Sequence, residues 1–183
     1  NAMENLHKKE KLEHMNQILS DLYVRDSVTG LYNRMGYQKL SISYFTIMRE
    51  KKMPVLVMFI DLDRLKYIND TFGHEYGDFA IVSIAKAMLK HCDADAIAAR
   101  TGGDEFIVLE GAKDEESGRV LAQKIRTELS KTQRAMQLPF DLSASIGAVV
   151  AHPGEENVLE SYVKRAEMLM YEEKAEKKVS RDS

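Results

Sequence analysis

Cysteine and long apolar runs are scarce in this chain of 183 residues. A single cysteine, Cys92, excludes an internal disulfide framework, cannot build a zinc site alone, and fits a reducing compartment. No apolar run approaches the length of a membrane span. We therefore expect this segment to be cytoplasmic, although the full-length protein could be tethered to a membrane upstream. The net charge of −3 argues against a nucleic-acid binder, which is usually basic.

The chain does contain enough apolar material for a core. Hydrophobic residues make up 44% and charged residues 30%, which fits one soluble domain with an appendage. Asn-Ala before Met3 is typical of a cloning remnant, so we expect the native start to be hidden. We assign residues 1–25 to this remnant and a linker or coiled-coil helix, residues 26–178 to the domain, and residues 179–183 to a frayed tail.

A charged helix is predicted from Glu4 to about Arg25. Apolar residues recur along it at alternating spacings of three and four, a short heptad seam made of Leu12, Met15, Leu19 and Leu22. This stripe could pack back on the domain or pair with a second copy. The polar character of the other faces favours pairing.

The order of apolar patterns after this helix indicates the fold. Strands are predicted at 55–60, 94–100, 106–109 and 142–151 and helices at 33–51, 64–69, 78–91, 114–135 and 156–178, with a two-glycine loop at 70–78. From the first strand onward, the order is the split βαβ arrangement. We therefore expect an α+β fold of the ferredoxin-like or palm type. Its mostly antiparallel sheet would carry packed helices and be preceded by the N-terminal signalling helix.

Two glycines, Gly102 and Gly103, lie between the two middle strands. Paired glycines between short apolar runs predict a hairpin, because glycine takes the positive φ of a tight turn. Asp104 and Glu105 follow directly, where their charges repel. A divalent cation would explain this pair, since hard cations take carboxylate oxygens. A solvated acidic turn is the alternative.

The exit of the first strand carries further acids, in Asp61-Leu62-Asp63. The predicted topology puts this exit and the hairpin turn at the same edge, so we expect Asp61 to lie near Asp104 and Glu105, with Asp63 as a candidate fourth member. Such carboxylates raise one another's pKa unless a cation neutralises them. Magnesium takes its remaining oxygens from water and phosphates, which suits nucleotide chemistry. No Walker-type glycine loop is present, which argues against a P-loop enzyme.

Gly102-Gly103-Asp104-Glu105-Phe106 is the signature of GGDEF domains, the diguanylate cyclases, and the chain resembles that family beyond the signature. Residues 26–34 resemble the motif with which the family's domain begins, residues 61–78 its nucleotide-binding block, and residues 145–147 its late strand. The resemblance implies an enzyme that joins two GTP molecules into cyclic di-GMP and releases pyrophosphate. The ribose 3′-hydroxyl of one GTP would attack the α-phosphate of the other across a site shared by two protomers.

The resemblance also implies roles for individual residues. The metal, Mg²⁺ or Mn²⁺, would be held by Asp61, the Leu62 carbonyl, Asp104 and Glu105. The catalytic residues would be Asp104 as candidate proton acceptor, Glu105 in support of the metal, and Lys66 on the phosphates. The substrate would be bound by Asn69 and Asp78 on guanine, with His74 nearby, and by Lys174 and Lys178.

Two departures from the family's pattern bear on activity. Its last helix usually ends with a lysine followed by Gly-Arg-Asn, whereas this chain has Lys177-Lys178-Val179. Lys178 shares a helix face with Lys174 and could replace the arginine, but lysine lacks arginine's bidentate fork, so we expect weaker GTP binding. An inhibitory product site, Arg-x-x-Asp, is also missing, because Asp93 and Ala96 stand at its positions. We predict no product inhibition of that type.

The implied partners are GTP, a second copy of the domain, and an upstream sensor outside this sequence that sets the pairing of the first helix. The alternative is a catalytically weak or inactive domain that binds GTP and regulates a partner domain, and the altered tail favours it. A purely structural dimerisation module is a further alternative. It would not need the guanine-reading and metal residues together.

Overall fold

The structure, a computed structural model, describes residues 1–155 and 158–183. Within these residues, four strands form one sheet in the order β2-β3-β1-β4, and all neighbouring strands are antiparallel. The strands are β1 (Val55–Leu62), β2 (Ile97–Arg100), β3 (Glu105–Gly111) and β4 (Ala144–Ala151). The predicted α+β fold with a mostly antiparallel sheet is confirmed.

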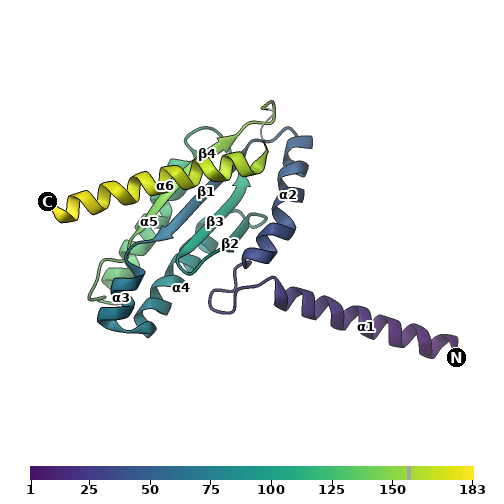
Figure 1. Cartoon of the computed structure of the whole chain (residues 1–183). Coiled ribbons are helices and arrows are strands. Elements are labelled where there is room, and N and C mark those ends of the chain that lie inside the picture. The colour runs from purple at the N-terminus through teal and green to yellow at the C-terminus, as the bar shows by residue number, and fades with distance from the viewer. Residues whose placement is uncertain (156–157) are drawn as a thin grey trace.

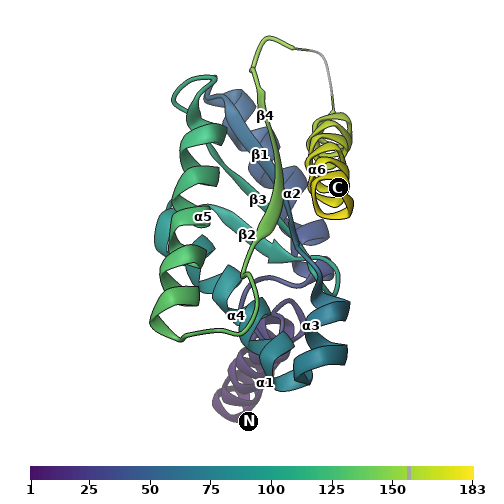
Figure 2. The same ribbon diagram turned by 90° about the vertical axis from the view of Figure 1, so that its left-hand side faces the viewer.

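Helices cover both faces of the sheet (Figures 1 and 2). In the described part of the chain they are α1 (Ala2–Tyr23), α2 (Arg34–Glu50), α3 (Leu65–Phe72), α4 (His74–His91), α5 (Ser117–Ala135) and α6 (Leu159–Asp182). One apolar cluster joins the sheet to α4 and α5, and a second joins its other face to α2 and α6. None of these helices has both the length and the apolar character needed to cross a bilayer.

The pleat of β1 explains how one strand serves both clusters. Successive side chains point to opposite faces. Those in the cluster with α4 and α5 are Leu56, Met58 and Ile60, and those in the cluster with α2 and α6 are Val55, Val57 and Phe59. The same alternation places Asp61, at the end of the strand, on the face that α6 covers.

The region after β1 is more helical than predicted. The loop expected at 70–78 is wrong, because α3 runs to Phe72 and α4 begins at His74. Gly73 alone separates the two helices, with a φ of 98° that favours glycine. Gly77, the second glycine of the expected loop, is instead helical and buried. One glycine therefore suffices to break the helix here.

Helix α6 is also longer than predicted. It continues to Asp182, through most of the segment expected to be a frayed tail, and the fraying of residues 179–183 stays a prediction. No glycine or proline occurs between Leu159 and Asp182 to end it. The predicted start of this helix, at Glu156, lies outside the described residues.

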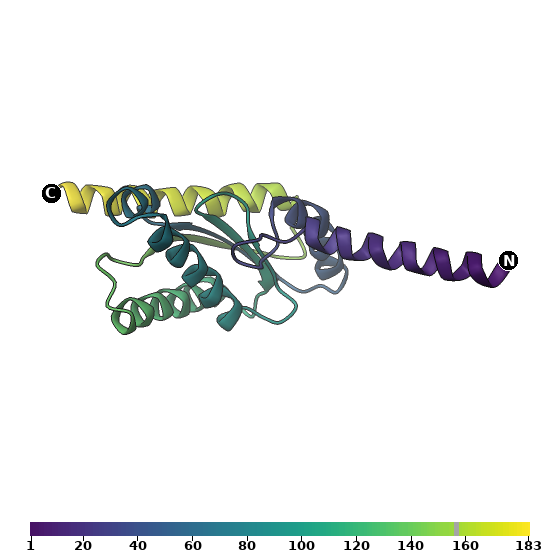
Figure 3. The same cartoon turned by 90° about the horizontal axis from the view of Figure 1, so that it is seen from below.

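Helix α1 projects away from the domain (Figures 1 and 3), and none of its residues is buried. The apolar stripe is exposed along its whole length, at 61% for Leu12, 50% for Met15, 60% for Leu19 and 69% for Leu22. The stripe therefore does not pack back on the domain. Pairing with a second copy stays a prediction.

Candidate active site

The acidic ends of β1 and β3 meet at one end of the sheet. Asp61 lies opposite Glu105 in the antiparallel register, and the Leu62 N–H donates to the Asp104 carbonyl at 2.9 Å. One carboxylate oxygen from each of Asp61, Asp104 and Glu105 lies within 4.8 Å of the others. The predicted convergence of these three acids is confirmed, and we call them the acidic cluster.

Asp61 is the buried member of the acidic cluster, with 3% of its surface exposed. Its Oδ2 accepts a hydrogen bond from Lys174 Nζ at 3.0 Å, while its Oδ1 has no partner among the residues that the structure describes. Burial and the charge of Asp104 raise the pKa of Asp61 to about 6, against the effect of Lys174. Burial also raises the pKa of Glu105, as do the charges of Asp104 and Glu167.

This environment fits a hard divalent cation. A buried carboxylate oxygen without a partner is costly, and converging negative charges add to that cost. A cation at this position would satisfy the Asp61 oxygen and neutralise the repulsion, and carboxylate oxygens are ligands that Mg²⁺ prefers. The ammonium of Lys174 supplies the positive charge within reach of Asp61 in the structure described here.

The turn between β2 and β3 is held by two arginines that the sequence analysis did not single out. Arg100 donates to the Gly103 carbonyl at 2.7 Å and forms an ion pair with Asp26 at 3.3 Å. Arg34 donates to the Thr101 carbonyl at 3.1 Å. The motif around residues 26–34 therefore braces the signature turn. The sequence shows an arginine beside each of two turns, but their partners Thr101 and Asp26 lie 67 and 74 residues away in the sequence.

The turn does not use the backbone conformation that the sequence predicted. The glycines with positive φ are Gly30 and Gly73, so the expectation of a left-handed conformation at Gly102 and Gly103 is wrong. The N–H groups of Thr101 and Gly102 both point to the Glu105 carbonyl, at 3.0 and 3.4 Å, which makes a wider turn than a two-residue hairpin. At Gly102 an added Cβ would lie 3.0 Å from Glu105 Oε2, so the Glu105 side chain would have to shift slightly.

Asp63 does not join the acidic cluster, which corrects the expectation of a fourth member. Its carboxylate accepts hydrogen bonds from Ser143 Oγ at 2.7 Å, Ser145 Oγ at 2.6 Å and Lys177 Nζ at 2.8 Å. Burial alone would raise the pKa of Asp63, but these bonds outweigh it and hold the pKa below its ordinary value. Lys177 was not among the predicted site residues, although it lies one helical turn from Lys174.

The residues expected to recognise guanine gather where α3 meets α4. Asn69, on α3, is half-buried, and a Cβ at Gly77 on α4 would lie 1.8 Å from its Oδ1. His74 and Asp78 are exposed on the first turns of α4, on either side of Gly77. The structure therefore brings Asn69 close to the α4 turn that carries Asp78.

The predicted phosphate-binding lysines differ in their surroundings. Lys174 is paired with Asp61 at the acidic cluster. Lys66 is exposed on the first turn of α3, and Lys178 is exposed on α6, with no hydrogen bond or ion pair to the residues that the structure describes. The phosphate-binding roles of Lys66 and Lys178 remain predictions.

Asp93, at the first position of the missing product site, lies beside a second acid, Glu110. The Asp93 N–H donates to Glu110 Oε1 at 3.3 Å, and burial and the charge of Asp93 raise the pKa of Glu110. Negative charge at these positions disfavours a phosphate ligand. The surface agrees with the predicted absence of that type of product inhibition, which stays a prediction.

A family model described as "Diguanylate cyclase, GGDEF domain" matches residues 23–180. The chain belongs to the GGDEF family. It is 34% identical over 153 residues to the diguanylate cyclase VdcA of Vibrio cholerae, covering 81% of this chain and 43% of that protein. It is 27% identical over 165 residues to the cyclic di-GMP phosphodiesterase NbdA of Pseudomonas aeruginosa, covering 90% of this chain and 21% of that protein.

The fold agrees with solved GGDEF structures. A crystal structure of the coiled coil and GGDEF domain of DgcB from Caulobacter crescentus, in complex with c-di-GMP, has a TM-score of 0.77 and 22% identity, covering 95% of this chain and 92% of that one. The chain spans less than half the length of the curated relatives VdcA and NbdA. The relatives of this chain include a protein named for the synthesis of cyclic di-GMP and one named for its hydrolysis.

Proposed function

We propose that this domain is an active diguanylate cyclase that condenses two GTP molecules into cyclic di-GMP and releases pyrophosphate. The observation that carries the proposal is the acidic cluster. Asp61 keeps a buried oxygen without a partner, and Asp104 and Glu105 of the family signature converge on it. A domain that only paired with other proteins would have no use for this costly arrangement of charge.

In this proposal Mg²⁺ or Mn²⁺ is held by Asp61, the Leu62 carbonyl, Asp104 and Glu105. Such an ion, when bound, stabilises charge on phosphate oxygens and makes a nearby hydroxyl more acidic. Asp104 is half-buried beside Asp61, where it accepts the proton of the attacking 3′-hydroxyl. Lys174 exchanges Asp61 for a phosphate oxygen when the nucleotide binds, and Lys66 contributes further positive charge.

Recognition of the base is assigned to the junction of α3 and α4. Guanine offers two N–H donors on one edge, which suit the carboxylate of Asp78, and Asn69 can pair with the remaining donor and acceptor groups. His74 lies one turn before Asp78 on the same helix. Adenine presents an acceptor at the same ring position and would be rejected.

The reaction needs two copies of the domain, because each GTP is attacked by the hydroxyl held on the other protomer. The exposed stripe of α1 is the surface that we assign to this pairing, under control of an upstream sensor. Holding the domains together raises the effective concentration of one half-site at the other. The rate per molecule should therefore rise with protein concentration, and a constant rate would contradict pairing as the limiting step.

A domain that binds GTP without turning it over is the second candidate, and the replaced tail at Lys177-Lys178-Val179 favours it. The test is to incubate the purified chain with GTP and Mg²⁺ and to measure cyclic di-GMP by chromatography. Asp104→Asn, which keeps the side-chain shape, is the control. If the native chain makes cyclic di-GMP and the Asp104→Asn variant makes none, the proposed cyclase activity is supported. GTP binding without product in both supports the second candidate, and absence of binding excludes both.

A further inference from the structure

The apolar contact between α6 and the sheet ends in the middle of the helix. Its buried residues are Leu159, Tyr162, Ala166 and Met170. At Gly147 of β4 the helix backbone lies against the strand, since an added Cβ would come within 1.9 Å of the Ala166 carbonyl. Beyond Met170 the apolar side chains of Tyr171 and Val179 are exposed, at 47% and 69%. Twelve residues of helix therefore follow without apolar anchorage.

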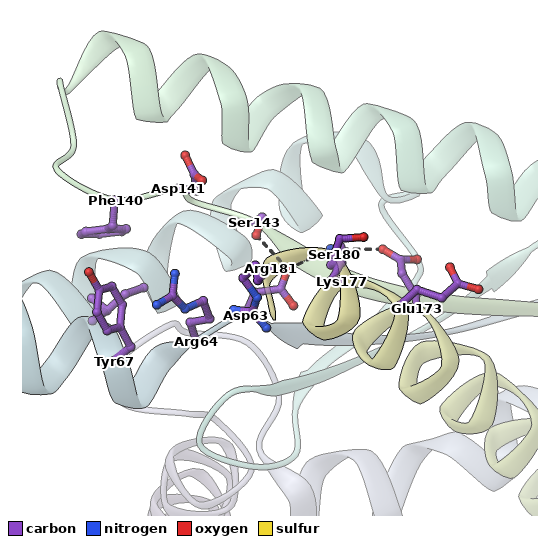
Figure 4. A pocket seen from close by; sticks show the side chains of 12 residues that line it. Asp63, Arg64, Tyr67, Phe140, Asp141, Ser143, Glu173, Lys177, Ser180 and Arg181 are labelled. Carbon is purple, nitrogen blue, oxygen red and sulfur yellow. Dashed lines mark hydrogen bonds and ion pairs between the residues drawn. The ribbon is translucent and has the colours of Figure 1, made fainter. Parts of the chain in front are cut away.

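Polar contacts hold the first part of this segment. Lys177 Nζ donates to Asp63 Oδ2 at 2.8 Å and to the Ala144 carbonyl at 2.7 Å. It also pairs with Glu173 at 3.2 Å, and Glu173 in turn receives two 2.7 Å hydrogen bonds from Arg126 of α5. Figure 4 shows Lys177 pointing from α6 toward Asp63 and Ser143. The ammonium of Lys177 thus ties α6 to the residue after β1 and to the first residue of β4, one turn beyond the ion pair of Lys174 with Asp61.

Apolar packing adds little around Lys177. A cavity of about 470 Å³ lies beside Lys177, between the last turns of α6, the start of α3 and the segment before β4 (Figure 4). It separates Ser180 and Arg181 from Tyr67 and Phe140 on the opposite wall. Because this space is not filled by side chains, packing cannot replace the bonds of Lys177.

Lys174 lies one turn before Lys177 and reaches the acidic cluster from the same helix. We propose that Lys177, through Asp63, positions this turn of α6 so that the ammonium of Lys174 is held at the nucleotide phosphates. This inference rests on the proposed nucleotide site, and it names Lys177 as a positioning residue that does not itself touch substrate. It also separates Lys177 from Lys178, which the resemblance assigns to the phosphates.

The test compares three substitutions on one helix, Lys177→Met, Lys178→Met and Lys164→Met. Lys164 is exposed in the second turn of α6, so its variant controls for the loss of one lysine. Two quantities are measured on the full chain. The first is amide hydrogen exchange of residues 171–182. The second is the dissociation constant of a Mg²⁺-bound GTP analogue with a methylene group between the α- and β-phosphates, which cannot release pyrophosphate.

Lys177→Met should lower the amide protection of residues 171–182 about tenfold, because it removes the charged hydrogen bonds that hold this part of α6. Lys177→Met should also raise the dissociation constant of the GTP analogue about tenfold. Lys164→Met should change neither the amide protection nor this dissociation constant. Lys178→Met should leave the amide protection unchanged. It should raise the dissociation constant of the analogue only if Lys178 itself binds phosphate.

Unchanged protection in Lys177→Met would overturn the inference. Lowered amide protection with unchanged affinity for the analogue would also overturn the inference. Lys177 would then stabilise α6 without positioning Lys174 for the nucleotide. If the native chain binds the analogue but makes no cyclic di-GMP, the proposed synthesis fails while both comparisons still decide the role of Lys177. If the native chain does not bind the analogue, both the proposed site and this inference are wrong.

Discussion

Asp61 and Asp63 are two residues apart, face the same helix, and are nearly equally buried, at 3% and 7% exposure. Their surroundings are opposite. Asp63 has a donor for each oxygen and a lowered pKa, whereas Asp61 has an oxygen without a partner, acidic neighbours, and a raised pKa. Each carboxylate is paired with its own lysine of α6, Lys177 or Lys174.

This contrast separates a structural carboxylate from a functional one in the same motif. A satisfied carboxylate joins elements, because its bonds are complete without a ligand. An unsatisfied buried carboxylate destabilises the free protein, and a ligand that completes its bonds recovers that cost. Asp63 therefore belongs to the framework of α6, and Asp61 belongs to the site.

The strongest test of this contrast is Asp61→Asn. We expect it to lower the rate of cyclic di-GMP synthesis by about 10³-fold, because it removes one charged ligand from a site whose role is to hold a cation. The free energy of unfolding without metal should not fall, because removing a buried charge whose Oδ1 has no partner offsets the loss of the ion pair with Lys174. Synthesis is measured by chromatography and stability by urea unfolding in EDTA. A variant that keeps its rate would place the cation elsewhere.

Asp63→Asn should have the opposite effect, a large loss of stability with a small loss of rate. An amide in place of the carboxylate loses the ion pair with Lys177 and turns an N–H₂ group toward donors, at a cost of about 2 kcal/mol in unfolding free energy. The rate of the folded enzyme should fall far less than in Asp61→Asn. Asp141→Asn is the matched control, because Asp141 is exposed and accepts from the neutral Gln133, so its cost should stay within about 0.5 kcal/mol. Equal costs at both positions would remove the structural role of Asp63.

Gly77→Ala separates the base-binding half of the site from the metal-binding half. The added Cβ would meet the Asn69 amide, which can rotate away, so we expect little loss of stability in a helix that otherwise favours alanine. GTP affinity should fall about tenfold because the displaced amide no longer faces the base, while Mn²⁺ affinity stays unchanged. Both affinities can be measured by calorimetry.

The control for this prediction is a double-mutant cycle. In an Asn69→Ala background, Gly77→Ala should have no further effect on GTP affinity, because the group that it displaces is already absent. Additive losses would show that the alanine acts through another contact, and Asn69 would lose its proposed role.

Much of this arrangement follows from the sequence. The apolar run of β1, the acids after it and the signature turn predicted one shared end of the sheet, because strand order and antiparallel pairing fix which ends meet. The different fates of Asp61 and Asp63 could not be predicted in the same way. They depend on Lys177, Ser143 and Ser145, which are 80 or more residues from Asp63 in the sequence.

The facing of α6 and the break between α3 and α4 could not be predicted from the sequence either. Lys177 and Lys178 are equally plausible neighbours of Lys174 by spacing, and only the direction of α6 across β4 decides that Lys177 faces Asp63. The wrong loop at 70–78 has a similar cause, since Gly73 and Gly77 look alike in sequence. One has a left-handed backbone and the other sits in a helix against Asn69. Local patterns do not distinguish these two uses of glycine.

The pH dependence of stability gives the smallest expected effect and the sharpest comparison. In the folded protein the pKa of Asp61 is raised from 3.8 to about 6, so its ionisation costs stability above pH 6, and this cost vanishes as the pH falls below 4. The pKa of Asp63 is lowered, so its contribution is stabilising above its ordinary value of 3.8 and is lost as the pH falls through the folded pKa. In EDTA, Asp61→Asn should raise the melting temperature at pH 8 by about 3 °C and lose this gain near pH 4. Asp63→Asn should lower the melting temperature at pH 8 by more than about 3 °C, and this decrease should become smaller below pH 4. Two difference curves of the same sign would mean that both carboxylates belong to one environment, and the division between site and framework would fail.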